Sequence, residues 1–141
     1  MDGVTLTPLK IIYHPKGDIL QALKFSEQSY CSFGEAYFTT IKEGEIKGWK
    51  KHKKMILNLI VPSGKVKFVI YDDRNSSNTF GEFYEIVISN ENYSRLTVQP
   101  GLWLGFQGLY LKESLILNIA SVEHQADEAE NESIDKMEYQ W

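Results

Sequence analysis

The sequence predicts an all-β fold, a β-sandwich or barrel that occupies residues 1–141 as a single domain. Short segments in which apolar and polar residues alternate are the first observation behind this prediction, and the turn-forming residues between them are the second. The third is composition: 43% of the residues are hydrophobic and 24% are charged, which excludes a disordered, collagen-like or coiled-coil chain. A chain of 141 residues is long enough to bury one core.

Alternation and an enrichment in β-branched and aromatic residues define the predicted strands. In chain order these are Lys10–Tyr13, Asp18–Lys24, Glu35–Thr40, Ile46–Trp49, Met55–Val61, Lys65–Tyr71, Phe83–Ile88, Arg95–Val98, Trp103–Phe106 and Leu115–Ser121. The pattern is clearest in residues 65–71, where Val66, Phe68 and Ile70 share one face. Turn-forming residues separate the strands: Pro15-Lys16-Gly17, Glu43-Gly44, Pro62-Ser63-Gly64, residues 72–78, residues 90–92 and Pro100-Gly101.

The chain changes character from about residue 123, where acidic residues dominate and apolar ones are few. The acidic residues are Asp127, Glu128, Glu130, Glu132, Asp135 and Glu138. We expect this segment to be a solvated helix or an irregular tail. The last apolar residues, Met137, Tyr139 and Trp141, are expected to dock on the body of the protein, because a free apolar terminus would be exposed to water.

Charge, cysteine content and hydropathy exclude several classes of protein. The net charge of −4 argues against a general nucleic-acid-binding surface. The single cysteine, Cys31, excludes an internal disulfide and a cysteine-based zinc site. No apolar run approaches the ~20 residues that span a bilayer, and the first residues lack the pattern of a signal peptide. We therefore expect a cytoplasmic protein without a membrane partner.

A basic stretch surrounds His52. It consists of Lys47, Lys50, Lys51, Lys53 and Lys54. If residues 46–61 are extended, Lys50, His52, Lys54 and Asn58 share one face, and Lys47 and Trp49 lie on the other. The stretch is either a surface or ion-paired strand without a ligand, or an anion site in which a diphosphate balances the amines. Nucleic acid stacked on Tyr37 and Trp49 is the least favoured alternative.

Other catalytic motifs are absent. The three histidines are far apart in sequence, so a metal site from His52 with Glu35 or Glu85 has no support, and we predict neither a metal nor a cofactor. There is no G-x-S-x-G elbow, phosphate-binding glycine loop or dinucleotide fingerprint. The aromatic fraction of 13% is high, and we expect most of these rings to fill the barrel and two or three to line a pocket beside the amines.

Two stretches carry a resemblance to a known family. The first is Ile46-Lys47-Gly48-Trp49-Lys50-Lys51-His52-Lys53-Lys54-Met55, followed by Ser63-Gly64-Lys65-Val66 and Tyr71-Asp72-Asp73-Arg74; the second is Val98-Gln99-Pro100-Gly101-Leu102-Trp103-Leu104-Gly105-Phe106, followed by residues 115–120. Over residues 15–125 the order and spacing resemble the dTDP-4-dehydrorhamnose 3,5-epimerase family of cupins and the related dTDP-sugar 3,4-ketoisomerases. The resemblance implies a cupin-type jelly roll with little helix, a homodimer, and a nucleotide-diphosphate 4-keto sugar bound in the barrel.

The resemblance also implies where the family's proton-transfer residues fall. The base histidine of the epimerases falls on Lys50, and the histidine that follows it in the ketoisomerases falls on His52. The second epimerase histidine falls on Leu104, and the acid tyrosine falls on Leu117. The usual catalytic residues are therefore altered, and only His52 retains a family side chain.

From these positions we predict an epimerase or isomerase that moves a proton beside the ketone of a nucleotide-diphosphate 4-keto-6-deoxy sugar, in deoxysugar or polysaccharide synthesis. The predicted catalytic residues are His52 or Lys50 as the base and Tyr37 as the acid. The predicted substrate-binding residues are Lys54, Arg95, Trp49, Asn58 and Trp103, with a surface or interface ion pair as the equally favoured alternative role of Arg95. A ketoisomerase and a non-catalytic sugar-nucleotide or carbohydrate-binding cupin are the competing functions, and the nucleotide and the sugar stay open.

Overall fold

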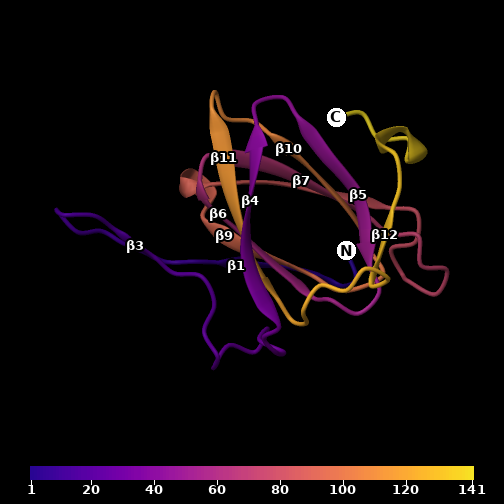
Figure 1. Cartoon of the computed structure of the whole chain (residues 1–141), viewed down its shortest axis with the longest axis horizontal. Coiled ribbons are helices and arrows are strands. Elements are labelled where there is room, and N and C mark those ends of the chain that lie inside the picture. The colour runs from indigo at the N-terminus through magenta and orange to yellow at the C-terminus, as the bar shows by residue number, and fades with distance from the viewer.

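The structure, a computed structural model of residues 1–141, consists of two five-stranded antiparallel sheets and a small hairpin (Figure 1). The first sheet has the order β1-β9-β6-β11-β4 and the second β12-β5-β10-β7-β8. The strands are β1 Val4–Pro8, β2 Ile11–Ile12, β3 Ile19–Leu20, β4 Glu35–Lys42, β5 Ile46–His52, β6 Leu57–Ser63, β7 Lys65–Tyr71, β8 Phe83–Ser89, β9 Ser94–Val98, β10 Trp103–Gly108, β11 Glu113–Ala120 and β12 Ala129–Asn131. Two 3₁₀ turns, η1 Asn90–Asn92 and η2 Ile134–Lys136, are its only helical segments, and no helix has the length and apolar character to cross a membrane. The predicted all-β jelly roll with little helix is confirmed.

The main core lies between the two sheets, where strands expose alternate side chains to each other. On β7, Val66, Phe68 and Ile70 are fully buried in this core, as the alternation predicts. Val69 points to the opposite face and is also fully buried, in a second apolar cluster with Trp49, Trp103 and Met137. The outer face of the second sheet is therefore covered as well.

The C-terminal segment provides that cover. Met137 is buried against Trp49 and Trp103, and Tyr139 and Trp141 pack on the same cluster, so the predicted docking of the last apolar residues is confirmed. The Trp49 indole Nε1 donates a hydrogen bond to the carbonyl oxygen of Ile134 at 3.1 Å. In Figure 1 the yellow end of the chain runs alongside β5.

The expectation of a solvated helix or irregular tail after residue 123 is wrong in one respect. Residues 129–131 form β12, which pairs with β5 through the registers Ala129↔His52 and Asn131↔Lys50. Glu128, just before this strand, is only 6% exposed. The pattern missed the strand because an edge strand of three residues has no apolar alternation of its own.

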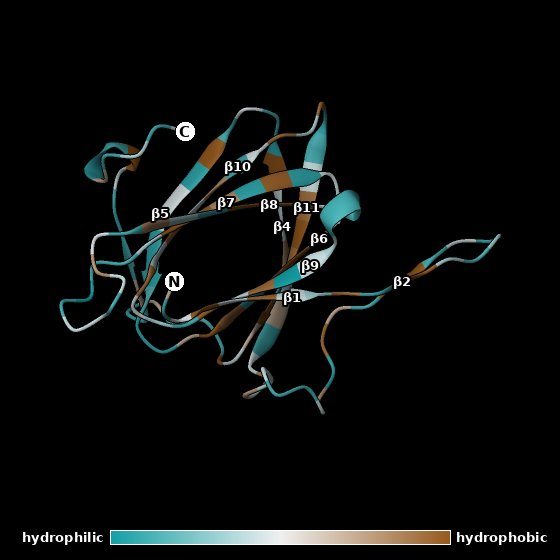
Figure 2. Ribbon diagram, turned by 180° about the vertical axis from the view of Figure 1, so that it is seen from behind, coloured by the Kyte–Doolittle hydropathy of each residue, from teal (hydrophilic) through white to brown (hydrophobic).

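Two other differences concern the N-terminal part. The strand β1 was not predicted, and it pairs with β9 at the edge of the first sheet. The predicted strands 10–13 and 18–24 shrink to β2 and β3, which have two residues each. They form a hairpin that extends away from the body (Figure 2). A strand needs a partner ladder, and the only partner of this arm is its own other half.

An irregularity in β5 sets the site. Leu104 of β10 pairs with Lys50, but Phe106 pairs with Lys47, so the strand segment between the two lysines is one residue longer than its partner on β10. Gly48, within this bulge, has φ +143°, and a Cβ there would lie 2.7 Å from the Cα of Gly105. The bulge turns Lys47 and Lys50 to the same side, which corrects the prediction that they lie on opposite faces.

Candidate active site

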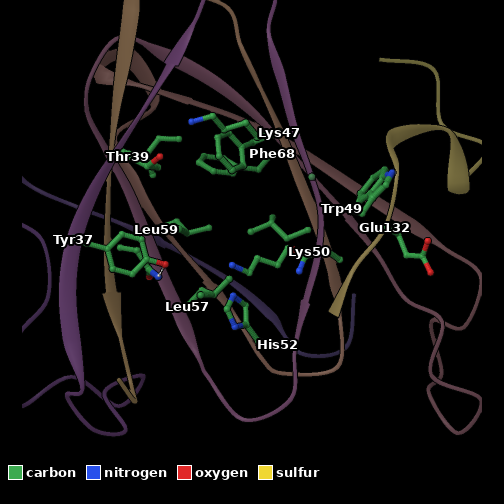
Figure 3. Close-up of a pocket in the computed structure, with 16 residues that line it drawn as sticks. Tyr37, Thr39, Lys47, Trp49, Lys50, His52, Leu57, Leu59, Phe68 and Glu132 are labelled. Carbon is green, nitrogen blue, oxygen red and sulfur yellow. Dashed lines mark hydrogen bonds between the residues drawn. The ribbon is translucent and has the colours of Figure 1, made fainter. Parts of the chain in front are cut away.

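A cavity of about 300 Å³ lies between the two sheets (Figure 3). Its apolar wall consists of Leu57, Leu59, Phe68, Leu104, Phe106 and Ile116. Polar side chains also line it: Tyr37, Thr39, Lys47, Lys50, His52, Asn118, Asn131 and Glu132. An apolar enclosure with a few convergent polar groups is typical of a small-molecule site.

His52 is held by a buried carboxylate. Its Nδ1 lies 2.5 Å from Oε2 of Glu128, and the two side chains are 7% and 5% exposed. The imidazole is at the end of β5, and Glu128 reaches it from the turn before β12. No hydrogen bond occupies Nε2, so this nitrogen is the one available for chemistry in the cavity.

Glu128 is itself fixed by the backbone. Its Oε1 accepts hydrogen bonds from the backbone N–H groups of Lys53, Lys54 and Met55 at 3.1, 2.9 and 2.8 Å. Burial alone would raise the pKa of Glu128, but the hydrogen bonds from His52 and the backbone lower it to about 2. Glu128 is therefore a carboxylate at neutral pH, and it requires a donor at Nδ1 of His52.

Two amines enter the same cavity from β5. Lys47 Nζ donates a hydrogen bond to the carbonyl oxygen of Thr40 at 2.8 Å. Lys50 lies two residues before His52, and no carboxylate of the chain forms an ion pair with either lysine. The cavity therefore presents positive charge that an anionic ligand can balance.

Tyr37 approaches from the opposite sheet. It lies on β4, whereas Lys50 and His52 lie on β5, and Figure 3 shows its ring pointing toward those two side chains. Its hydroxyl oxygen accepts a hydrogen bond from Nδ2 of Asn118 at 2.9 Å. The structure thus brings together all three predicted catalytic residues, Tyr37, Lys50 and His52.

The five predicted substrate-binding residues are placed differently. Lys54 is exposed in the bend after β5 and does not line the cavity. Trp103 and the Trp49 ring lie in the outer cluster with Met137, although the Trp49 position borders the cavity (Figure 3). Trp103 Nε1 donates to Asp73 Oδ2 at 2.8 Å, on the outside of the sheet. These two rings pack on the outer face of the second sheet, because β5 and β10 direct them away from the space between the sheets.

Arg95 is also outside the cavity. It is fully buried, and its guanidinium donates to the Ala22 carbonyl at 2.7 Å, to Glu27 Oε2 at 2.6 Å and to Ser29 Oγ at 2.7 Å. Arg95 therefore does not line this cavity. The alternative role, an ion pair, is present with Glu27, but the arginine is not on the surface: it is buried in the interior, where it anchors the N-terminal segment. Asn58 is 3% exposed and lies behind the cavity wall, bonded to Thr97 and to the Ile119 carbonyl.

Two positions implied by the resemblance have different outcomes. Leu104 lines the cavity beside Lys50, its partner on the neighbouring strand, as the resemblance implies for a position that faces the substrate. Leu117 does not line it; on β11 the inward side chains are Ile116 and Asn118, because neighbouring residues of a strand face opposite ways. The polar side chain that β11 offers to the cavity is Asn118.

Sequence reasoning missed three residues of the site. Glu128 is one of several acidic residues in its segment, and its spacing gave no indication of a contact with His52, which is 76 positions away. Lys47 was assigned to the wrong face because the alternation rule takes no account of a bulge. Asn118 sits next to the position implied for the acid, and strand alternation applied to residues 115–121 would have singled it out.

Comparisons with known proteins concern the chain as a whole. No protein-family model matches the chain. The chain is 24% identical over 133 residues to a probable low-salt glycan biosynthesis epimerase, Agl13, of Haloferax volcanii, covering 93% of this chain and 85% of that protein. It is 24% identical over 134 residues to the spore coat polysaccharide biosynthesis protein SpsL of Bacillus subtilis, covering 95% and 89%.

Solved structures extend the likeness. A dTDP sugar isomerase from Desulfovibrio desulfuricans G20 superposes with a TM-score of 0.93 and 29% identity, covering 96% of this chain and 87% of that one. A dTDP-4-dehydrorhamnose 3,5-epimerase from Sulfolobus tokodaii gives a TM-score of 0.85 at 23% identity, covering 99% and 82%. These findings confirm the predicted resemblance: the two solved structures are a dTDP-sugar isomerase and a dTDP-4-dehydrorhamnose 3,5-epimerase, one curated relative is a probable glycan biosynthesis epimerase, and the other is a polysaccharide biosynthesis protein.

Proposed function

We propose that this chain is an epimerase or isomerase of a nucleotide-diphosphate 4-keto-6-deoxy sugar, acting in deoxysugar or polysaccharide synthesis. The observation that carries the proposal is the pair of His52 and buried Glu128 on one wall of a cavity whose opposite wall presents Tyr37. The likeness to dTDP-sugar isomerases and epimerases over nearly the whole chain supports the substrate class.

In the proposed mechanism His52 is the base. Glu128 accepts a hydrogen bond from Nδ1–H of neutral His52, so the lone pair is on Nε2, which takes the proton from the carbon beside the ketone. The electron pair of that C–H bond forms an enolate with the ketone oxygen. Tyr37 then gives its hydroxyl proton to a carbon of the enolate, and solvent resets both groups. Lys50 places an ammonium near the developing oxyanion and is the alternative base.

The second cavity amine, Lys47, accounts for the nucleotide end of the substrate. Lys47 has no carboxylate partner, so it can balance the diphosphate while Lys50 serves the ketone end. The apolar wall suits the methyl group and the less polar ring face of a 6-deoxy sugar. Neither feature selects the base of the nucleotide.

Among the competing functions, the ketoisomerase has a specific observation in its favour. The structural neighbour with a TM-score of 0.93 is a dTDP sugar isomerase. In addition, Leu104 lines the cavity where the resemblance places the second epimerase histidine, and leucine cannot transfer a proton. A binding module without catalysis would keep the cavity but would not need the Glu128 carboxylate behind His52.

The test is incubation with dTDP-4-keto-6-deoxyglucose in heavy water, followed by NMR and mass spectrometry. Deuterium at C3 and C5 indicates double epimerisation, and deuterium at C3 with migration of the carbonyl indicates isomerisation. Binding without incorporation would establish the non-catalytic cupin instead. His52→Asn should abolish turnover, whereas the exposed His124→Asn, outside the cavity, should leave it unchanged; unchanged turnover in His52→Asn would overturn the assignment of the base.

We also propose that the protein is a homodimer. Tyr13, Phe25 and Phe38 are 78%, 83% and 63% exposed on the N-terminal part and on the edge strand β4, and a second copy would cover them. Size-exclusion chromatography with light scattering should give twice the chain mass, and Phe25→Glu with Phe38→Glu should shift it toward the monomer. A cytoplasmic location stays a prediction of the sequence.

A further inference from the structure

A chain of buried hydrogen bonds ends at Tyr37. Thr97 Oγ1 donates to Asn58 Oδ1 at 2.9 Å, and Asn58 Nδ2 donates to the Ile119 carbonyl at 3.1 Å. The backbone N–H of Asn58 donates to Asn118 Oδ1 at 3.1 Å. Asn118 Nδ2 donates to the Tyr37 hydroxyl oxygen at 2.9 Å. Asn58, Thr97 and Asn118 are all 3% exposed or less, so the protein alone sets their orientation.

This network determines which way the Asn118 amide points. A backbone N–H can only donate, so the atom of Asn118 that faces Asn58 must be the oxygen. The NH₂ group is then the one that faces Tyr37. An amide nitrogen cannot accept a hydrogen bond, and the Tyr37 oxygen must therefore be the acceptor in this contact.

The hydroxyl proton of Tyr37 is consequently free of the network. No group of the chain accepts a hydrogen bond from this hydroxyl, and Tyr37 lines the cavity opposite His52. The proton can therefore be given only to solvent or to a ligand in the cavity. After it leaves, the Asn118 N–H remains bonded to the phenolate oxygen and stabilises its charge.

We infer that Asn118 is a positioning residue, which holds Tyr37 as a proton donor aimed at the substrate. The inference rests on the proposed function and deepens it. In the step concerned, the O–H bond of Tyr37 breaks, and the electron pair of the enolate forms the new C–H bond as the C4 carbonyl is restored. Asn118 exchanges no proton, and Asn58 and Thr97 orient it from behind.

The isosteric variant Asn118→Asp tests this role. One carboxylate oxygen still accepts a hydrogen bond from the backbone N–H of Asn58. The other oxygen replaces the NH₂ group and accepts a hydrogen bond from the Tyr37 hydroxyl. The Tyr37 hydroxyl then donates its hydrogen bond within the protein and not to the substrate. We expect kcat for product formation to fall by at least about 10²-fold, the range that a lost general acid produces, with KM changed less than about 3-fold. Exchange of solvent deuterium into unreacted dTDP-4-keto-6-deoxyglucose should continue, because His52 and Glu128 are untouched.

Three further variants complete the experiment. Tyr37→Phe should reproduce the separation of exchange from product formation, and Tyr37→Phe with Asn118→Asp should be no slower than Tyr37→Phe alone. Asn92→Asp makes the same substitution on the exposed turn η1 and should behave as wild type. Asn118→Ser, which shortens the side chain and removes the NH₂ donor, serves the same purpose should Asn118→Asp not fold.

The outcomes distinguish the inference from the function beneath it. Exchange without product formation in Asn118→Asp supports the positioning role. A variant that forms product at the wild-type rate, or one that loses exchange and product formation together, overturns it while leaving the proposed function in place. A wild-type protein that neither exchanges deuterium nor forms product overturns the proposed function, and the inference with it.

Discussion

Glu128 does two things at once, because its two oxygens serve different partners. Oε1 receives three backbone N–H groups from the bend after β5, and Oε2 receives Nδ1 of His52. The bend fixes the carboxylate, and the carboxylate fixes the imidazole. A histidine in this arrangement has a defined tautomer, which a base requires.

Replacing Glu128 by Gln tests the tautomer. The three backbone donors select the amide oxygen, so the NH₂ group faces Nδ1 and requires it to accept. The proton of neutral His52 then moves to Nε2, and that nitrogen can no longer act as a base. We expect kcat to fall about 10²–10⁴-fold, measured by product formation and deuterium exchange. Glu130→Gln, two residues later on β12 and half exposed, is the matched control and should keep wild-type activity.

Arg95 allows the opposite test, of a residue that supports the fold and not the site. Lysine retains the charge but cannot reach Ala22, Glu27 and Ser29 together. Arg95→Lys should lower the free energy of unfolding by about 2 kcal/mol in urea titrations, with KM and kcat of the folded enzyme unchanged. A KM raised about 10-fold or more at unchanged stability would instead show that Arg95 binds the substrate.

At the scale of elements, the C-terminal segment and β5 form one unit. Backbone hydrogen bonds of 3.0 Å join Trp49 and Glu132 in both directions, and the Trp141 ring lies over Gly105 of β10. A Cβ at Gly105 would lie 2.7 and 2.8 Å from two carbon atoms of that ring. Glycine at this position is what permits the indole to approach the sheet.

A double-mutant cycle measures this contact. Gly105→Ala should destabilise the protein by about 1–3 kcal/mol, because the methyl group displaces the indole. In a Trp141→Ala background much of that loss should disappear, which gives a coupling energy of about 1 kcal/mol or more in chemical denaturation. Gly105→Ala combined with Leu111→Ala, which is 82% exposed, should be additive; equal additivity in both cycles would show that the tail does not rest on Gly105.

Strands with one face buried between the two sheets were predictable from their alternation. Contacts that depend on how distant segments fold together were not. The segment 65–71 was recognised as a strand because burial on one face imposes alternation on Val66, Phe68 and Ile70. Lys50 and His52 were predicted to share a face because they are two positions apart on one strand, with only Lys51 between them. The contact of Glu128 with His52 depends on how the tail folds back, which local sequence does not encode.

On the scale of the whole molecule, two carboxylates tie distant segments together, and a third holds the loop after β7 in place. Glu128 joins the C-terminal segment to His52, Glu27 joins the N-terminal segment to Arg95, and Asp72 bonds Arg74, Ser77 and Thr79. The hydrogen bond from Arg74 lowers the pKa of Asp72 far below its ordinary value, despite burial. Burial would raise the pKa of Glu27, but the hydrogen bond from Arg95 lowers it.

These shifts predict loss of stability in acid. The pKa of Glu128 falls from its ordinary value of 4.5 to about 2 on folding, so below pH 4.5 the unfolded chain takes up a proton that the folded chain refuses. The stabilisation is complete above pH 4.5 and is lost as the pH falls toward about 2. In that window acidification through Glu128 lowers the free energy of unfolding by up to about 1.4 kcal/mol per pH unit, measured in urea titrations. Glu128→Gln and Asp72→Asn should each be less stable at pH 7, and their free energy of unfolding should fall less steeply as the pH is lowered. The exposed Glu113→Gln should keep the wild-type dependence on pH. A Glu128→Gln protein as steeply acid-sensitive as wild type would mean that this carboxylate does not hold the tail to the barrel.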